Sequence, residues 1–247
     1  MKKIISFFGS MFCVMLLFGA IDVEAKTIYT KTVIKGGHTY QLIDESMTFA
    51  KAKEYCEKRG GHLVTITSAK EQKIVKNLVK KGKKNSYWLG AKKDQYGNFT
   101  RWITGEPMNY TYFSKGQPDN FLGNENTLMI YRASNTLSVG ETPYYWNDIR
   151  ADGECNGETF FGKKNFGLIC EWDKKVYTIT YHVNKGTLHK NTKFTYAKGE
   201  SFTLKKPTRP GYVFKGWYED AKFKKKVTKI KKNSKKNYVL YAKWVKK

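Results

Sequence analysis

The segment FAKAKEYCEKRGGHLVTI, residues 49–66, combines a short amphipathic helix with a strand. Three apolar residues recur at positions i, i+3 and i+7, which predicts one buried helix face: Phe49, Ala52 and Cys56. Ser46 precedes this face and is a candidate N-cap, and Gly60-Gly61 ends the helix. The apolar run HLVTI at 62–66 then predicts a short strand.

A second helix and several short strands surround this segment. Ser68 can cap a helix that runs to about Lys80 and buries Ile74, Val75 and Leu78. Residues 28–43 are rich in β-branched and aromatic side chains around Gly36-Gly37, which predicts a hairpin. Further strands are expected at 87–91, 99–103, 128–131, 144–148 and 166–172. Two helices, many short strands and one long irregular loop at 104–126 predict an α+β fold.

The long loop concentrates side-chain oxygens. It contains GQPDNFLGNENT at 116–127, and WND follows at 146–148. Calcium takes roughly 6–8 oxygen ligands, and five residues here could supply them: Gln117, Asp119, Glu125, Asn147 and Asp148. The alternative is a turn-rich loop without a metal, because Pro, Asp, Asn and Gly are common turn formers. Since long structureless loops are uncommon without a function or a ligand, the cation site is favoured.

The first 25 residues have the layout of a secretory signal peptide. Lys2 and Lys3 precede an apolar run, and Val23-Glu24-Ala25 ends in the small-residue pattern of a cleavage site. An uncleaved membrane anchor is the alternative, because the run approaches the length needed to span a bilayer. We expect cleavage after Ala25 and no transmembrane segment in the chain that remains.

Secretion would place the cysteines in an oxidising compartment, where disulfides form. Cys13 leaves with the signal peptide, so Cys56, Cys155 and Cys170 remain. An oxidising compartment permits one disulfide and leaves one cysteine over. The spacing of the three does not resemble a zinc site.

Charge divides the remaining chain into two domains. Residues 174–247 hold 22 Lys and Arg against three acidic residues, a net charge of +19. The whole chain carries +25, which leaves only +6 for residues 1–173. Such an abrupt change predicts a boundary between a domain at 26–173 and a basic domain at 174–247.

Residues from about 38 to 173 resemble a C-type lectin-like domain. The matching stretches run in family order: Phe49…Ala52…Cys56, GGHLVTI at 60–66, WLG at 88–90, Trp102, QPDN at 117–120, WND at 146–148 and LICEW at 168–172. The resemblance implies two helices, short antiparallel strands, a long loop and a Cys56–Cys170 disulfide. A second disulfide of the family is incomplete, because Thr127 stands where its first cysteine belongs. Cys155 is then its orphaned partner or an unrelated surface thiol.

The resemblance also implies a ligand. In sugar-binding members a Gln-Pro-Asp or Glu-Pro-Asn triplet, a later Glu and the WND pair bind one Ca²⁺, and two sugar hydroxyls complete its shell. The implied ligands here are Gln117, Asp119, Glu125, Asn147 and Asp148. The Gln-Pro-Asp order resembles the galactose-selective type, and Phe121 lies near the aromatic position of galactose binders. The glycine-rich insert that fixes that ring is absent, so galactose is only slightly favoured. A protein partner with purely structural calcium is the alternative.

The basic domain resembles a second family. Residues 176–244, with GYVFKGWYED at 211–220 and YVLYAKW at 238–244, resemble the Listeria–Bacteroides repeat of internalin B and related bacterial surface proteins. The resemblance implies a small β-grasp-like fold. Nine lysines crowd one region: Lys222, Lys224, Lys225, Lys226, Lys229, Lys231, Lys232, Lys235 and Lys236. They form either a solvated surface or a site for anionic envelope polymers, and no nucleic-acid motif accompanies them.

Catalysis finds little support in the sequence. The four histidines, His38, His62, His182 and His189, stand in no recognisable nucleophile–base or metal motif. Carboxylates that serve as cation ligands are poorly suited to act as a general acid and base. The sequence therefore predicts a calcium-dependent, carbohydrate-binding protein that is secreted or associated with a bacterial cell envelope, and not an enzyme.

Overall fold

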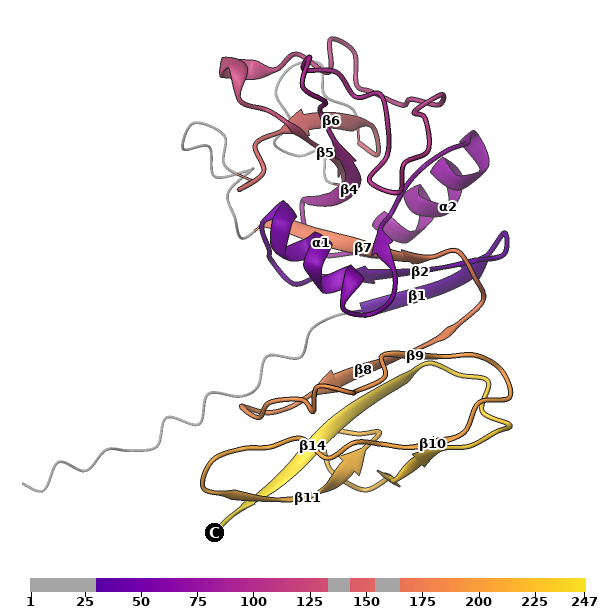
Figure 1. Ribbon diagram of the computed structural model, residues 1–247, viewed down its shortest axis with the longest axis vertical. Coiled ribbons are helices and arrows are strands. Elements are labelled where there is room, and N and C mark those ends of the chain that lie inside the picture. The colour runs from indigo at the N-terminus through magenta and orange to yellow at the C-terminus, as the bar shows by residue number, and fades with distance from the viewer. Residues whose placement is uncertain (1–29, 133–142, 154–164) are drawn as a thin grey trace, which may run out of the picture.

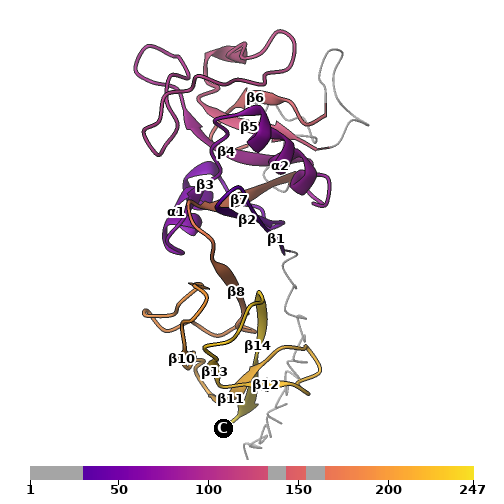
Figure 2. The ribbon, with the colours of Figure 1, turned by 90° about the vertical axis from the view of Figure 1, so that its right-hand side faces the viewer.

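A computed structural model describes residues 30–132, 143–153 and 165–247 of the chain. The described residues form two bodies, each built on its own β-sheet (Figure 1). The N-terminal body carries both helices, and the C-terminal body contains strands and turns (Figure 2). None of the helices in these residues is long and apolar enough to cross a membrane.

The N-terminal body is organised around a mixed sheet. Its strands are β1 (Thr30–Lys35), β2 (His38–Ile43), β3 (His62–Leu63), β4 (Ser86–Lys92), β5 (Thr127–Tyr131), β6 (Trp146–Ile149) and β7 (Phe166–Trp172). The order is β1-β2-β7-β4-β5-β6, with β3 paired to β7. The last strand of the body thus lies at its centre. Strand β7 lies between β2 and β4, and it is antiparallel to β2 but parallel to β4. The sheet is therefore mixed, whereas antiparallel strands were expected.

The hairpin and the helices agree with the sequence patterns. Gly36 and Gly37 both have positive φ and join β1 to β2 in a tight turn. Helix α1 (Phe49–Glu57) buries the three predicted residues, Phe49, Ala52 and Cys56. Helix α2 (Ala69–Val79) begins at the predicted cap Ser68, whose hydroxyl accepts a hydrogen bond from the Glu71 amide. It buries Ile74, Val75 and Leu78.

Three details of the sequence prediction are wrong. The N-cap of α1 is Thr48, because the Ser46 hydroxyl instead accepts a hydrogen bond from the Lys84 ammonium. Only the first two residues of the segment 62–66 pair as a strand. The segment 99–103 forms isolated bridges, Ala91 with Trp102 and Arg101 with Pro107, because the chain turns back at once through positive-φ Gly105.

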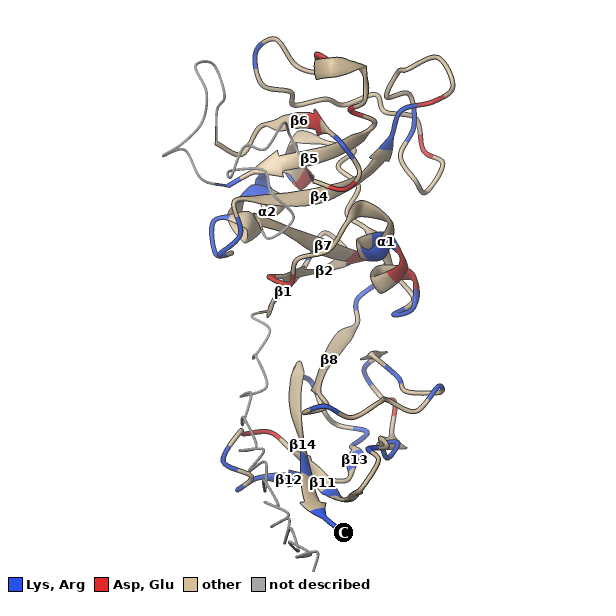
Figure 3. Ribbon diagram, turned by 90° about the vertical axis from the view of Figure 1, so that its left-hand side faces the viewer, with Lys and Arg blue, Asp and Glu red and all other residues tan. Residues whose placement is uncertain are grey.

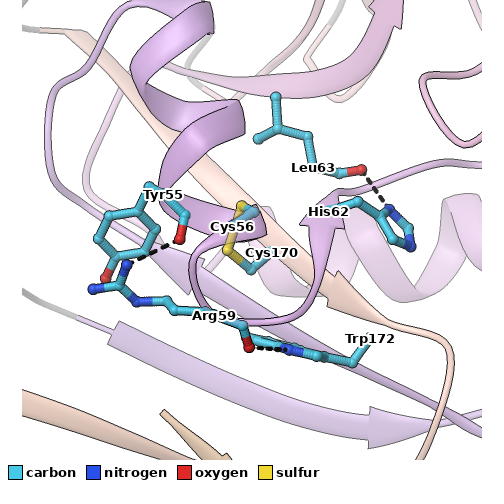
Figure 4. The surroundings of a disulfide bond; sticks show 7 residues. All are labelled: Tyr55, Cys56, Arg59, His62, Leu63, Cys170 and Trp172. Carbon is cyan, nitrogen blue, oxygen red and sulfur yellow. Dashed lines mark hydrogen bonds between the residues drawn. A yellow bond between two sulfur atoms is a disulfide. The ribbon is translucent and has the colours of Figure 1, made fainter. Parts of the chain in front are cut away.

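The sheet and the helices enclose two apolar clusters. One includes Trp146 and Trp102 beneath the long loop, and the other includes Trp88, stacked on Phe166 at a centroid distance of 4.3 Å. The Cys56–Cys170 disulfide lies in the second cluster and joins α1 to β7 (Figure 4). The predicted pairing is therefore confirmed. It closes 114 residues of chain, and loops of this size give the largest stabilisation on the chain-entropy model.

The basic body is a second sheet with its own core. Its strands are β8 (Tyr177–His182), β9 (Thr195–Tyr196), β10 (Phe202–Thr203), β11 (Tyr212–Tyr218), β12 (Lys226–Val227), β13 (Lys229–Ile230) and β14 (Tyr238–Lys246). Five of them follow the order β12-β11-β14-β8-β9, and β10 pairs with β13. The first and last strands, β8 and β14, run parallel at the centre. Trp217 on β11 and Leu240 on β14 belong to the buried core of this body.

Polar contacts join the two bodies. The hydroxyls of Thr32 and Thr178 lie 3.1 Å apart, and the Gln41 amide donates to Thr178 and Thr180 at 3.3 Å each. Arg59 adds a second contact, because its guanidinium lies 3.3 Å from the Tyr55 ring centroid and 4.3 Å from that of Phe194 in the basic body. The junction is therefore hydrogen-bonded, with one cation–π contact.

Candidate calcium and carbohydrate site

The structure brings together the side chains of three of the five predicted oxygen donors, Asp119, Glu125 and Asp148, and the other two, Gln117 and Asn147, are near them in the chain. Gln117 and Asp119 lie on either side of Pro118 in the long loop, and the Gln117–Pro118 peptide bond is cis. Glu125 stands just before β5, and Asn147 and Asp148 lie on β6, which pairs with β5. The pairing of β5 with β6 therefore carries Glu125 and the WND segment to the same place, beside the end of the loop.

Three carboxylates converge there. Oxygens of Asp119, Glu125 and Asp148 lie within 4.8 Å of one another. Asp148 is fully buried and Glu125 is 3% exposed, whereas Asp119 lies at the surface. Two buried carboxylates and one exposed carboxylate form an acidic cluster that reaches the surface at Asp119.

The loop backbone wraps around the buried carboxylates. The Asp148 carboxylate accepts hydrogen bonds from the amides of Asp119, at 3.2 Å, and Asn120, at 3.0 Å. Glu125 accepts from the Phe121 amide at 2.9 Å. Asn120 adopts a left-handed conformation with φ of 52°, which asparagine tolerates better than most residues. The bend at this residue directs consecutive amides toward the carboxylates.

Burial and neighbouring charge raise the pKa of Glu125 to about 8. Desolvation is the largest cause, and the Asp148 carboxylate is the second, while the Phe121 amide opposes both. A carboxyl group with this pKa holds its proton at neutral pH unless a cation lies beside it. Metal binding to such a group would release that proton.

Asn147 supplies an independent sign of a missing partner. Its side-chain amide nitrogen donates to the Tyr131 hydroxyl at 2.6 Å. Its carbonyl oxygen is buried and has no hydrogen-bond partner among the residues that the structure describes. Buried acceptors are rarely left unpaired. An unpaired amide oxygen on the residue before Asp148 is a further oxygen donor of the kind that Ca²⁺ prefers.

Lys93 is a residue of the site that the sequence did not predict. The ammonium of Lys93, which follows β4, lies 2.7 Å from Asp148 Oδ2, and the two side chains are only 8% and 0% exposed. The amide of Lys93 donates to the Asn126 carbonyl, which fixes the residue against the loop. No local pattern separates Lys93 from the other basic residues of this lysine-rich chain. With Lys93, three ionised carboxylates and one divalent ion sum to zero charge.

The aromatic residues near the site divide into two groups. Three of them pack against the buried cluster around Trp146: Tyr110, Tyr112 and Phe113. Phe121 is 49% exposed, and its side chain stands at the rim of the loop. A ring exposed at the rim is available to a ligand.

Thr127 explains how the fold manages without the family's second disulfide at this position. Its hydroxyl donates to the Ile149 carbonyl at 2.7 Å and is buried between β5 and β6. This hydrogen bond links β5 to β6 at the position where the family resemblance places a cysteine. Cys155 lies outside the described residues.

Comparison with known proteins identifies the fold. Residues 45–155 match the lectin C-type domain, and residues 177–243 match the Listeria-Bacteroides repeat domain. The chain is 32% identical to perlucin of Haliotis laevigata over 138 residues, which cover 56% of this chain and 77% of perlucin. The chain belongs to the C-type lectin family. Its N-terminal body is the lectin domain, and its basic body is the repeat domain.

Further relatives of the lectin domain are more distant. The chain is 26% identical to C-type lectin domain family 4 member G of Mus musculus, over 49% of this chain and 38% of that protein. Among solved structures, it is 27% identical to the carbohydrate-recognition domain of the mouse scavenger receptor C-type lectin. That match covers 58% of this chain and 94% of the other, with a TM-score of 0.45.

Proposed function

We propose that the lectin domain binds a carbohydrate in a calcium-dependent manner through Gln117, Asp119, Glu125, Asn147 and Asp148. The convergence of the Asp119, Glu125 and Asp148 carboxylates carries the proposal, and the unpaired buried amide oxygen of Asn147, the residue before Asp148, supports it. Calcium would supply a coordination centre for two vicinal sugar hydroxyls. Family membership supports carbohydrate as the ligand class, and the convergent oxygen donors support calcium.

The residues of the site would divide the work. Asp148 and Glu125 accept hydrogen bonds from loop amides and would bind the ion through their remaining lone pairs. Asp119 and Gln117 lie nearer the solvent and can also accept from or donate to sugar hydroxyls. Lys93 balances part of the negative charge at Asp148, and calcium would compete with its ammonium for that carboxylate.

A galactose-type preference is the finer part of the proposal. The order Gln117-Pro118-Asp119 places the amide first and the carboxylate second, and Phe121 offers an exposed ring for the apolar face of galactose. Exchange of the two donors by Gln117→Glu with Asp119→Asn should reverse the order of galactose and mannose affinities.

Calorimetric titration of galactose and mannose into the purified chain, with calcium and again with a chelator, tests the proposal. We expect heat only with calcium, stronger for galactose, and lost in Asn147→Ala. Arg101→Gln is a matched control, because its side chain is exposed and donates to the Gly105 carbonyl, away from the five proposed ligands. Sugar binding that persists in chelator contradicts calcium dependence, and calcium binding without any sugar response contradicts the carbohydrate.

A protein partner with structural calcium is a second candidate. Leu122 is 62% exposed next to Phe121, and two exposed apolar side chains at a loop tip suit a protein surface. Binding to such a partner would be chelator-sensitive but unaffected by free sugars. Either candidate makes the chain a binding protein and not an enzyme.

We also propose that the repeat domain attaches the protein to anionic envelope polymers. All nine lysines of the 222–236 region are exposed, and basic residues line many of the domain's loops (Figure 3). A groove of about 350 Å³ lies beside Lys206, Lys215 and Lys226. Retention on isolated cell walls that falls with salt but resists chelator supports this role, and retention indifferent to salt contradicts it.

We further propose that residues 1–25 are a signal peptide and that the domains span residues 26–173 and 174–247. The protein would then be secreted or associated with a bacterial cell envelope. The disulfide and the surface-type repeat support an extracellular location. The parallel central pairing of β8 with β14 supports a β-grasp-like fold for the repeat domain.

A further inference from the structure

A second cluster of ligating side chains lies at the opposite end of the lectin sheet, where β7 leads into the repeat domain. His38 begins β2, His62 begins β3, Glu171 is on β7 and Asp173 follows β7 directly. In the sheet register Thr39 pairs with Trp172, and His62 pairs with Glu171. Because side chains alternate between the faces of a sheet, all four residues project from the same face.

The side chains form two overlapping groups that share Glu171: ligand atoms of His62, Glu171 and Asp173 lie within 4.8 Å of one another, and so do those of His38, Glu71 and Glu171. His38 Nδ1 lies 2.8 Å from Glu171 Oε1 and 3.5 Å from Asp173 Oδ1, and His62 Nε2 lies 3.1 Å from Asp173 Oδ1. Ligands about 2.0–2.1 Å from one tetrahedral ion lie roughly 3.3 Å apart. The observed separations of 2.8 to 3.5 Å bracket that spacing.

The hydrogen bonds of His62 place the lone pair of its ring opposite a carboxylate. Its Nδ1 lies 2.9 Å from the Leu63 carbonyl oxygen (Figure 4). A carbonyl only accepts, so Nδ1 carries the hydrogen and the lone pair of a neutral ring resides on Nε2. That lone pair faces both oxygens of Asp173, at 3.1 and 3.3 Å. Two acceptors this close require a proton or a metal ion between them.

The surroundings also match those of a metal site. Ligating histidines usually donate their other ring N–H to a carbonyl or carboxylate, as His62 does here. Glu171 is held in turn, because its Oε2 accepts from the amide of Thr65 at 3.0 Å and from its hydroxyl. Oε1 is the atom left toward the histidines. Glu171 is 1% exposed and Asp173 is 65% exposed, so the cluster has a rigid floor and an open entrance.

We propose that His38, His62, Glu171 and Asp173 form a binding site for a zinc-class transition metal ion, independent of the calcium site. Two imidazoles and two carboxylates suit Zn²⁺, whereas Ca²⁺ prefers oxygen ligands throughout. Two carboxylates and one divalent ion sum to zero charge with neutral histidines. Bound zinc would hold Asp173, which leads into the repeat domain, against the lectin sheet.

Calorimetric titration of ZnCl₂ into the purified chain, in a Cys155→Ser background and with excess calcium, tests the proposal. The background removes a thiol that could bind zinc, and the calcium keeps the oxygen site occupied. We expect one zinc per chain, with affinity reduced at least about tenfold in His62→Gln and in Asp173→Asn. Asp173 is exposed, so its variant tests the site even if the His62 variant fails to fold.

His189→Gln, in an exposed turn of the repeat domain, is the matched control and should bind zinc like the parent. NMR of the imidazole nitrogens adds a direct readout, because zinc should shift Nε2 of His62 and leave Nδ1 protonated. Absence of zinc binding, with His62 doubly protonated beside Asp173, overturns the proposal. Zinc binding that both site variants leave unchanged overturns it as well. Sugar binding is measured separately, so neither result depends on the lectin activity.

Discussion

Replacement of Lys93 by methionine tests the electrostatics of the lectin site. In the native domain the Lys93 ammonium lies 2.7 Å from Asp148, and both side chains are nearly inaccessible to water. Methionine keeps most of the length and apolar stem of lysine and removes the charge. Asp148 then keeps its two amide donors, from Asp119 and Asn120, but loses its cation.

Loss of one partner from a buried ion pair costs about 3–5 kcal/mol of unfolding free energy. The two remaining amide hydrogen bonds place the expected loss near the lower end, at about 3 kcal/mol in chelator. Bound calcium restores a positive charge beside Asp148, and in the variant it is no longer repelled by the Lys93 ammonium. Lys93→Met should therefore bind calcium more tightly than the native chain. Each tenfold gain in affinity recovers about 1.4 kcal/mol in saturating calcium.

Urea unfolding followed by the helical circular dichroism signal reports on the lectin domain, because α1 and α2 both belong to it. The titration is run in chelator and in calcium, together with Lys53→Met. Lys53 forms an exposed pair with Glu57 on α1, so its removal should cost no more than about 0.5 kcal/mol. A Lys93→Met loss as small as that of the control would refute a buried pair. Weaker calcium binding in Lys93→Met would show that the ammonium organises the site and does not compete with the ion.

Three further predictions concern the framework. Joint replacement of Cys56 and Cys170 by alanine should lower the unfolding free energy by about 4–5 kcal/mol, measured by urea titration without reductant, and an unchanged midpoint would contradict the cross-link. Trp88→Ala should cost about 3–5 kcal/mol, because the indole is fully buried and stacked; a loss under about 1 kcal/mol in thermal unfolding would argue against that packing. Burial lowers the pKa of His182 in the repeat domain, so protonation favours the unfolded chain and stability should fall as pH drops below about 6.5. His182→Phe should flatten the measured stability–pH curve, whereas exposed His189→Phe should not.

Much of the local structure could be read from the sequence. Ser68 caps α2 as predicted, and Gly36-Gly37 turns the first hairpin, because caps and tight turns depend on a few adjacent residues. The α+β class followed from periodicity, and the resemblance supplied the order of elements and the Cys56–Cys170 pair. Where a distant residue competes, local reasoning fails: Ser46 does not cap α1, because Lys84 engages its hydroxyl.

At the candidate site, the sequence predicts the oxygen donors, and the tertiary structure decides which charges lie beside them. Its five oxygen donors were found in the sequence because carboxylates and amides concentrate in one turn-rich loop and one short WND segment. The sequence could not reveal that Lys93 neutralises Asp148, since the two are 55 residues apart and Lys93 is one of many lysines. It also gave no sign that His38, His62, Glu171 and Asp173 converge, because β7 returns to the centre of the sheet and brings together residues up to 135 positions apart. Residue type and spacing thus determined which atoms can bind a cation, and strand pairing alone decided which charges face them.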